Sequence, residues 1–108
     1  MKTMEKITTP IVGETLVAQW GYEASYPEFY KVIKVAGEYV TLQELKRIYM
    51  GPGSFYDARI MSTNGEASEE KPFRRKFKQN GDSFYVKINS YKYAYTWNGK
   101  PCVEYNHH

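Results

Sequence analysis

Residues 91 to 105 read Tyr91-Lys92-Tyr93-Ala94-Tyr95-Thr96-Trp97-Asn98-Gly99-Lys100-Pro101-Cys102-Val103-Glu104-Tyr105. Up to Trp97, aromatic residues alternate with small or charged ones, which is the two-residue period of a β-strand. Asn98-Gly99 then separates this segment from a second one. Asn-Gly between two strands is a strong hairpin signal, because both residues accept the positive φ of a tight turn. The stretch therefore predicts two antiparallel strands in which Tyr95 lies opposite Cys102.

Other segments upstream carry the same period or an enrichment in β-branched residues. They predict further strands at 14–20, 29–36, 39–45, 55–61, 73–78 and 84–88. The segments between them are rich in turn-forming residues, and we expect loops or turns at 21–27, 37–38, 51–54 and 79–82.

The segment 41–49 is open to two interpretations. Thr41-Leu42-Gln43-Glu44 fits a helix capping box, and Leu42, Leu45, Ile48 and Tyr49 would share one helical face. Against a helix, Tyr39-Val40-Thr41-Leu42 follows a short turn directly and is a good strand sequence. We favour the strand.

The composition points to the same fold class. Among the 108 residues are 11 Tyr, 5 Phe and 2 Trp, whereas leucine occurs only at Leu16, Leu42 and Leu45. Aromatic residues favour strands and leucine favours helices. We expect one mainly β domain over 1–108, with a loosely ordered lead-in at 1–13 and a flexible loop at 62–70. Its fold should be a small antiparallel barrel or strongly bent sheet with at most one short helix, an SH3-like or Tudor-like barrel being favoured over an open sheet that carries one helix.

Several classes of protein do not fit the sequence. No apolar run approaches the roughly 20 residues of a membrane-spanning helix, and residues 1–7 lack the apolar stretch of a signal peptide. The single cysteine, Cys102, permits no internal disulfide, which favours the cytoplasm. We find neither a nucleotide-binding glycine loop nor a hydrolase or metalloprotease motif, and we expect no cofactor, no metal and no catalytic residue.

Charge is unevenly distributed along the chain. Residues 1–70 carry a net charge of −3 and residues 71–108 a net charge of +6. The excess is densest at Arg74, Arg75, Lys76 and Lys78, interleaved with phenylalanines. Alternation places Arg75 on the apolar face, where it needs a carboxylate or an aromatic ring as partner. The other three cations repel one another on one face, which an anionic partner such as nucleic acid would relieve, or they protect an edge strand from aggregation.

Aromatic residues form two further candidate groups. Tyr91, Tyr93 and Tyr95, with Lys92 between them, are predicted either to form one wall of the core, which we favour, or to provide a stacking surface for bases or a partner protein. Trp20, Tyr22 and Tyr26 border a loop, and we expect them either to line a binding pocket or to hold that loop over the end of a barrel. His107-His108 are adjacent on the chain, so they would point to opposite faces of a strand and make a poor metal-binding pair.

Several segments resemble a family of small, uncharacterised proteins encoded by bacterial phages, plasmids and other mobile elements. The matching pieces cover roughly half of the chain and leave residues 50–70 unmatched. They are Val12–Val17, Trp20-Gly21-Tyr22, Phe29-Tyr30-x-Val32, Lys71-Pro72-Phe73-x-Arg75, Tyr95-x-Trp97-Asn98-Gly99-Lys100-Pro101 and Tyr105-x-His107. The family has no assigned activity, so the resemblance supplies no site residue. It implies a mobile-element origin and the cytoplasm of a bacterial host cell.

We therefore expect a non-enzymatic binding module that engages nucleic acid through its basic strand and neighbouring aromatics. The alternative is an inhibitor that binds a host defence protein, of the anti-CRISPR or anti-restriction type, and a hydrolase or nuclease using His107 or His108 is a remote third. The sequence indicates no membrane partner and leaves the oligomeric state open.

Overall fold

The computed structural model describes residues 9–20, 24–53 and 58–106, and every regular element in these ranges is a β-strand. The predicted mainly β class is confirmed, and so is the strand, rather than the helix, at the start of segment 41–49. The strands are β1 (Thr15–Trp20), β2 (Ala24–Ala36), β3 (Tyr39–Glu44), β4 (Ile48–Pro52), β5 (Arg59–Ser62), β6 (Phe73–Asn80), β7 (Ser83–Asn89), β8 (Lys92–Thr96) and β9 (Cys102–Asn106).

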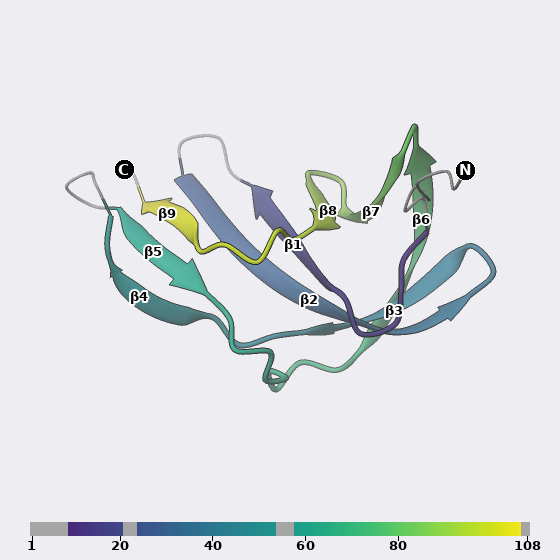
Figure 1. Ribbon diagram of the computed structural model, residues 1–108, viewed down its shortest axis with the longest axis horizontal. Coiled ribbons are helices and arrows are strands. Elements are labelled where there is room, and N and C mark those ends of the chain that lie inside the picture. The colour runs from purple at the N-terminus through teal and green to yellow at the C-terminus, as the bar shows by residue number, and fades with distance from the viewer. Residues whose placement is uncertain (1–8, 21–23, 54–57, 107–108) are drawn as a thin grey trace, which may run out of the picture.

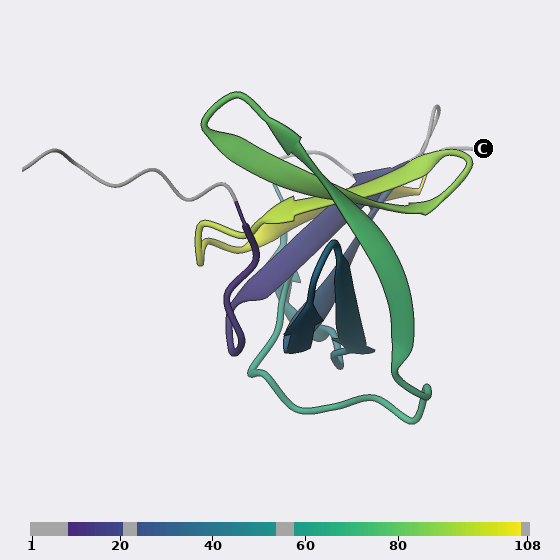
Figure 2. The same ribbon diagram turned by 90° about the vertical axis from the view of Figure 1, so that its right-hand side faces the viewer.

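Six of the strands form a closed antiparallel barrel (Figures 1 and 2). Going round the ring, the order is β1, β2, β3, β6, β7, β8, and β8 pairs with β1 again. This is an up-and-down barrel in which neighbours in the ring follow one another along the chain, apart from the excursion between β3 and β6. The small antiparallel barrel is thus confirmed, whereas its SH3-like or Tudor-like form stays a prediction.

The remaining strands extend the sheet away from the barrel. β9 pairs with the first residues of β2, β5 pairs with β9, and β4 pairs with β5. These three strands lie on the left of Figure 1, on the side away from β6 and β7. β2 belongs to both parts, because its 13 residues pair with β1, β3 and β9, and a register irregularity between Val32 and Lys34 interrupts its ladder with β3.

The predicted hairpin at Asn98-Gly99 is wrong. β8 pairs with β1 and β7, and β9 pairs with β2 and β5, so Tyr95 lies opposite Val17 and not opposite Cys102. Of the two turn residues only Gly99 has a positive φ, of 85°, so the turn is not the type I′ that a two-residue Asn-Gly hairpin uses. Instead the Asn98 side chain accepts a hydrogen bond from the Lys100 amide at 2.9 Å, and the chain crosses from the barrel to the outer strands.

Two other predictions need correction. Residues 51–52, predicted to lie in a turn, belong to β4, where the ladder with β5 is irregular between Tyr49 and Gly51 and Gly51 takes a φ of 134°. The predicted loop at 21–27 is a strand from Ala24 onward. Along one edge of β2, Ala24 and Ser25 pair with β9, and the ladder with β3 begins at Tyr30. Pro27 lies between these two ladders, so its lack of an N–H group removes no hydrogen bond to either strand.

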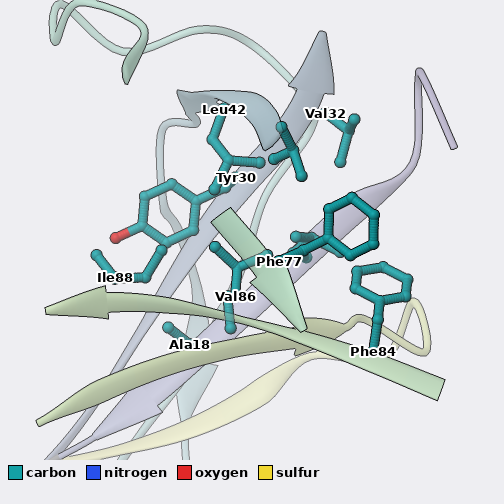
Figure 3. Packing of buried hydrophobic residues seen from close by; sticks show 11 residues of the cluster. Ala18, Tyr30, Val32, Leu42, Phe77, Phe84, Val86 and Ile88 are labelled. Carbon is teal, nitrogen blue, oxygen red and sulfur yellow. The ribbon is translucent and has the colours of Figure 1, made fainter. Parts of the chain in front are cut away.

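The inward positions of the six strands fill the barrel with side chains, as Figure 3 shows. Within it, the rings of Phe77 and Phe84 meet edge-on at 6.2 Å between centroids. The buried cluster consists of Leu16, Ala18, Tyr30, Val32, Val40, Leu42, Phe77, Phe84, Val86, Ile88 and Ala94. Because so few residues fill the barrel, each of them contributes strongly to its stability.

The segment 63–72 forms no strand, and most of its residues are exposed. Its backbone is nevertheless tied to the end of β3, through hydrogen bonds from Lys46 N to Glu66 O at 2.8 Å and from Ser68 N to Glu44 O at 2.9 Å. The loop predicted at 62–70 overlaps this segment, although Ser62 is the last residue of β5, and its flexibility stays a prediction.

Replacing Phe84 by alanine removes its ring together with the contact to Phe77, and leaves a cavity in the barrel. We expect the free energy of unfolding to fall by about 3–5 kcal/mol, as is usual for a buried Phe. Lys87→Ala, on the outward face of the same strand, should change it by less than about 0.5 kcal/mol. Urea denaturation of both variants provides the measurement, and equal effects would contradict this description of the barrel interior.

Candidate functional site

The outward positions of β6, β7 and β8 form a continuous surface on one side of the barrel. Phe77, Phe84, Val86 and Ala94 point inward, so the residues between them point outward. We call this surface the basic–tyrosine face. It consists of Arg74, Lys76, Lys78, Tyr85, Lys87, Tyr93 and Tyr95.

The tyrosines of segment 91–95 lie on the outside of the barrel, so their favoured placement in the core is wrong. Tyr91, Tyr93 and Tyr95 are 60%, 38% and 51% exposed. Ala94 faces inward on the same strand and lies opposite Ala18 on one side and Val86 on the other. Two alanines meeting across neighbouring strands leave little room for a ring, and this accounts for the tyrosines being outside.

One outward tyrosine ring, that of Tyr85, contacts two others. The ring of Tyr85 on β7 lies 5.7 Å from that of Tyr93 and 6.2 Å from that of Tyr95, measured between centroids. Planes at 69° and 37° show an edge-on contact and a tilted one. Such contacts hold rings in a defined orientation. Tyr85 is therefore a fixed support between the two more exposed rings of β8.

Two cations lie directly beside these rings. Strand pairing places Lys78 directly opposite Tyr85, and Lys87 directly opposite Tyr93. All four cations of the face are exposed. No aspartate or glutamate occurs within β6, β7 or β8, so nothing on these strands neutralises the charge.

Two of the cations are held at the far side of the face by β3 and the turn before it. The guanidinium of Arg74 lies over the Tyr39 ring at 4.5 Å from its centroid. Lys76 Nζ lies 3.1 Å from a carboxylate oxygen of Glu38, whose hydrogen bond and charge raise the pKa of Lys76. Lys78 and Lys87 have no ion pair within the described residues, so they are better placed to meet an anionic partner.

The alternative explanation of the basic strand, protection of an exposed sheet edge, stays open. β6 lies inside the ring, but residues 73–76 pair with β3 alone and residues 77–80 pair with β7 alone. Each half of the strand therefore has one ladder, and lysines such as Lys78 are a usual device for blocking further pairing along an open edge.

Two of the predicted binding cations are not part of the basic–tyrosine face. Arg75 belongs to the inward register of β6: its guanidinium lies over the Phe73 ring at 4.8 Å and donates to Ile88 O at 3.0 Å. The expectation of an aromatic partner for Arg75 is thereby confirmed. Lys92 points into the barrel, is 9% exposed, and pairs with Glu28.

The other predicted residues are placed as follows. Tyr91 lies in the turn before β8, and Trp97 packs edge-on against Phe29 at 5.0 Å, with its indole N–H donating to Lys100 O at 2.8 Å. Tyr22, the side chains of Trp20 and Tyr26, and His107-His108 lie outside the described residues.

A second group of titratable side chains closes one end of the barrel interior. Lys92 Nζ and the Tyr30 hydroxyl both donate to the same carboxylate oxygen of Glu28, the latter at 2.9 Å. Burial, and then the Glu28 carboxylate, raise the pKa of Tyr30, so its hydroxyl keeps its proton. Glu44 lies opposite Tyr30, and its pKa is raised by burial and by the charges of Glu28 and Glu70.

A neighbouring ion pair ties the outer strands to the barrel. Arg47 donates to Glu104 of β9 at 2.6 Å, and the Glu104 side chain is 10% exposed. The charges of Arg47 and Glu104 neutralise each other, which fits a structural role. Sequence patterns could not find either group, because their members come from distant segments that only the closed barrel brings together.

Other chemistry is sparse among the described residues. They contain no group of three or more His, Cys, Asp or Glu that could hold a metal ion. Nor do they include a helix long and apolar enough to cross a membrane. Burial raises the pKa of the half-buried Cys102 thiol, which lowers its reactivity at neutral pH.

Two members of the basic–tyrosine face, Tyr85 and Lys87, were missed by sequence reasoning. Their signal was present: once Phe84, Val86 and Ile88 are assigned inward, Tyr85 and Lys87 must point outward. Comparisons of the chain with protein-family models, with curated proteins and with solved structures give no match. The resemblance to proteins of mobile elements therefore stays a prediction.

The Lys92–Glu28 pair can be tested by a double-mutant cycle. Lys92→Met leaves the Glu28 carboxylate in the barrel without the ammonium, and we expect a loss of about 2–3 kcal/mol, since the pair is somewhat less buried than those that cost 3–5 kcal/mol. Glu28→Gln keeps an acceptor for Tyr30. Losses that add up in the double variant, measured by urea denaturation, would show that the two side chains are not coupled.

Glu44 should make stability depend on pH in the direction opposite to that of a salt-bridged carboxylate. Because its pKa in the folded protein is raised above 4.5, its contribution to stability is fully present below pH 4.5 and is lost as the pH rises through the folded value. Glu44→Gln should therefore stabilise the protein at pH 7 relative to the wild type, and the difference should shrink towards pH 4. Thermal melting at both pH values is the measurement, and a destabilised variant at pH 7 would contradict the prediction.

Proposed function

We propose that this protein is a small, non-enzymatic module that binds nucleic acid through the basic–tyrosine face. The observation that carries the proposal is the composition of that face: four exposed cations next to three tyrosines, of which Tyr85 contacts the other two, on strands without a single carboxylate. Positive side chains in such an array bind phosphates and release condensed counterions.

The charges of β6 support the proposal further. Like charges in a row destabilise a folded protein, and Arg74, Lys76 and Lys78 stand in a row on the outward face of β6. An anionic partner would remove this repulsion.

We also propose that the protein originates from a phage, plasmid or other mobile element and acts in the cytoplasm of a bacterial host. The support is the resemblance of its sequence segments to proteins of that kind. An inhibitor of a host defence protein is the second candidate. Exposed tyrosines such as Tyr95 are typical anchors of protein interfaces, which is the observation in its favour.

Neutralising Lys78 and Lys87 together should weaken binding to DNA and RNA. Because two fewer phosphates are then neutralised by the protein, the slope of log K against log salt should become shallower by about 1.5. The matched control is Lys31→Gln with Lys34→Gln. It removes the same charge from β2, which lies across the ring from β7, and should leave the slope unchanged.

Fluorescence anisotropy with labelled oligonucleotides over a range of salt concentrations measures both effects. Absence of binding to any nucleic acid at low salt would overturn the proposal. A stoichiometric protein recovered from nuclease-treated bacterial lysate, and no longer recovered with the Lys78/Lys87 variant, would then favour the inhibitor.

A further inference from the structure

We infer that the ligand of the basic–tyrosine face is single-stranded, with bases stacking on Tyr93 and Tyr95 while Tyr85 positions the two rings. This inference rests on the proposed function and narrows it to one class of nucleic acid. It also assigns separate roles to the three tyrosines.

The exposures distinguish the stacking rings from the supporting one. Tyr93 and Tyr95 are 38% and 51% exposed. Tyr85 is less exposed than either of them, and its ring contacts both of theirs. Tyrosines of β8 alternate with the buried Lys92 and Ala94, so a rotation of the strand that hides the rings would bring a paired ammonium out of the barrel. The rings are consequently held outward by the interior as well as by Tyr85.

Ring spacing and charge placement fit a single strand. Tyr93 and Tyr95 are two residues apart on β8, which places them about 7 Å apart along the strand. Lys78 and Lys87 stand on the neighbouring strands opposite Tyr85 and Tyr93. Bases could thus lie on the rings of β8 while the phosphates between them reach the lysines of β6 and β7. Stacking of this kind tolerates any base, because every base has a flat π face.

A duplex would use the same surface poorly. Its bases are stacked on each other, so their faces are closed to side chains, and a protein reads it by inserting an element into a groove. The outward tyrosines project from the middle of a sheet and form no such element. A duplex would therefore meet the cations alone and leave two exposed aromatic rings without a role.

The test compares affinities for an oligothymidine of about ten nucleotides and for a duplex of the same length, in one buffer, by anisotropy. We expect the single strand to bind more tightly. Tyr93→Val and Tyr95→Val, which keep a β-branched side chain suited to a strand, should each weaken single-strand binding about fivefold or more. Tyr93→Phe and Tyr95→Phe keep the ring and should bind as the wild type does.

The salt dependence separates stacking from charge. The valine variants keep every cation, so their slope of log K against log salt should equal that of the wild type, whereas the Lys78/Lys87 variant lowers it. A second measurement needs no variant: ultraviolet crosslinking of the wild-type complex should place oligothymidine on the tryptic peptide that begins at Tyr93, after Lys92.

The outcomes distinguish this inference from the function on which it rests. A duplex bound as tightly as the single strand, with valine variants unaffected and no crosslink on that peptide, would overturn the inference and leave a charge-based nucleic-acid module. No binding to either oligonucleotide would overturn both. Were a valine variant to unfold, the crosslink and the comparison of single strand with duplex would still decide.

Discussion

Closure of the barrel by β1 is the constraint on which the rest of the structure depends. The six residues of β1 pair with β2 along one edge, and Leu16, Val17 and Ala18 pair with β8 along the other, so the sheet becomes a ring with one interior. That interior is narrow where Ala18 and Ala94 face each other. It therefore admits small side chains from β8 and directs the tyrosines outward. The same closure carries Lys92 to Glu28, across a separation of 64 residues in sequence.

Local sequence patterns were sufficient for most of the strands and insufficient for their pairing. Alternation located β1, β3, β6 and β7 within one or two residues, because each has a clearly apolar inner face. The Asn98-Gly99 signal failed because the strands on its two sides pair with other strands and not with each other. β8 completes the ring with β1, and β9 pairs with β2 and β5. β4 was missed because Gly51 and Pro52 normally end strands, whereas here they lie beside an irregular ladder at the outermost position.

The site was predictable in its chemistry and not in its orientation. Arg74, Lys76 and Lys78 follow directly from alternation with Phe73 and Phe77, and so do Tyr85 and Lys87 on the next strand. The side of β8 that faces the interior could not be read locally. Hydrophobicity favours tyrosines inside and lysine outside, yet the half-buried carboxylate of Glu28 on β2 stabilises Lys92 within the barrel. The side of β8 that faces the interior thus depends on Glu28, a residue that the spacing in the sequence does not link to β8.

The tie between the end of β3 and the segment before β6 has a consequence for how this protein can vary. Between Leu45 and Ala67 the chain leaves the barrel, builds β4 and β5, and returns to an isolated bridge between those same two residues. Because the bridge holds the two ends of this segment together, a change in the length of the segment puts little strain on the six-stranded ring. A related chain could therefore have a longer, shorter or entirely different segment between these two residues and keep the six-stranded ring. β9 would then be the strand that has to adapt, since it is the element that joins the excursion to β2.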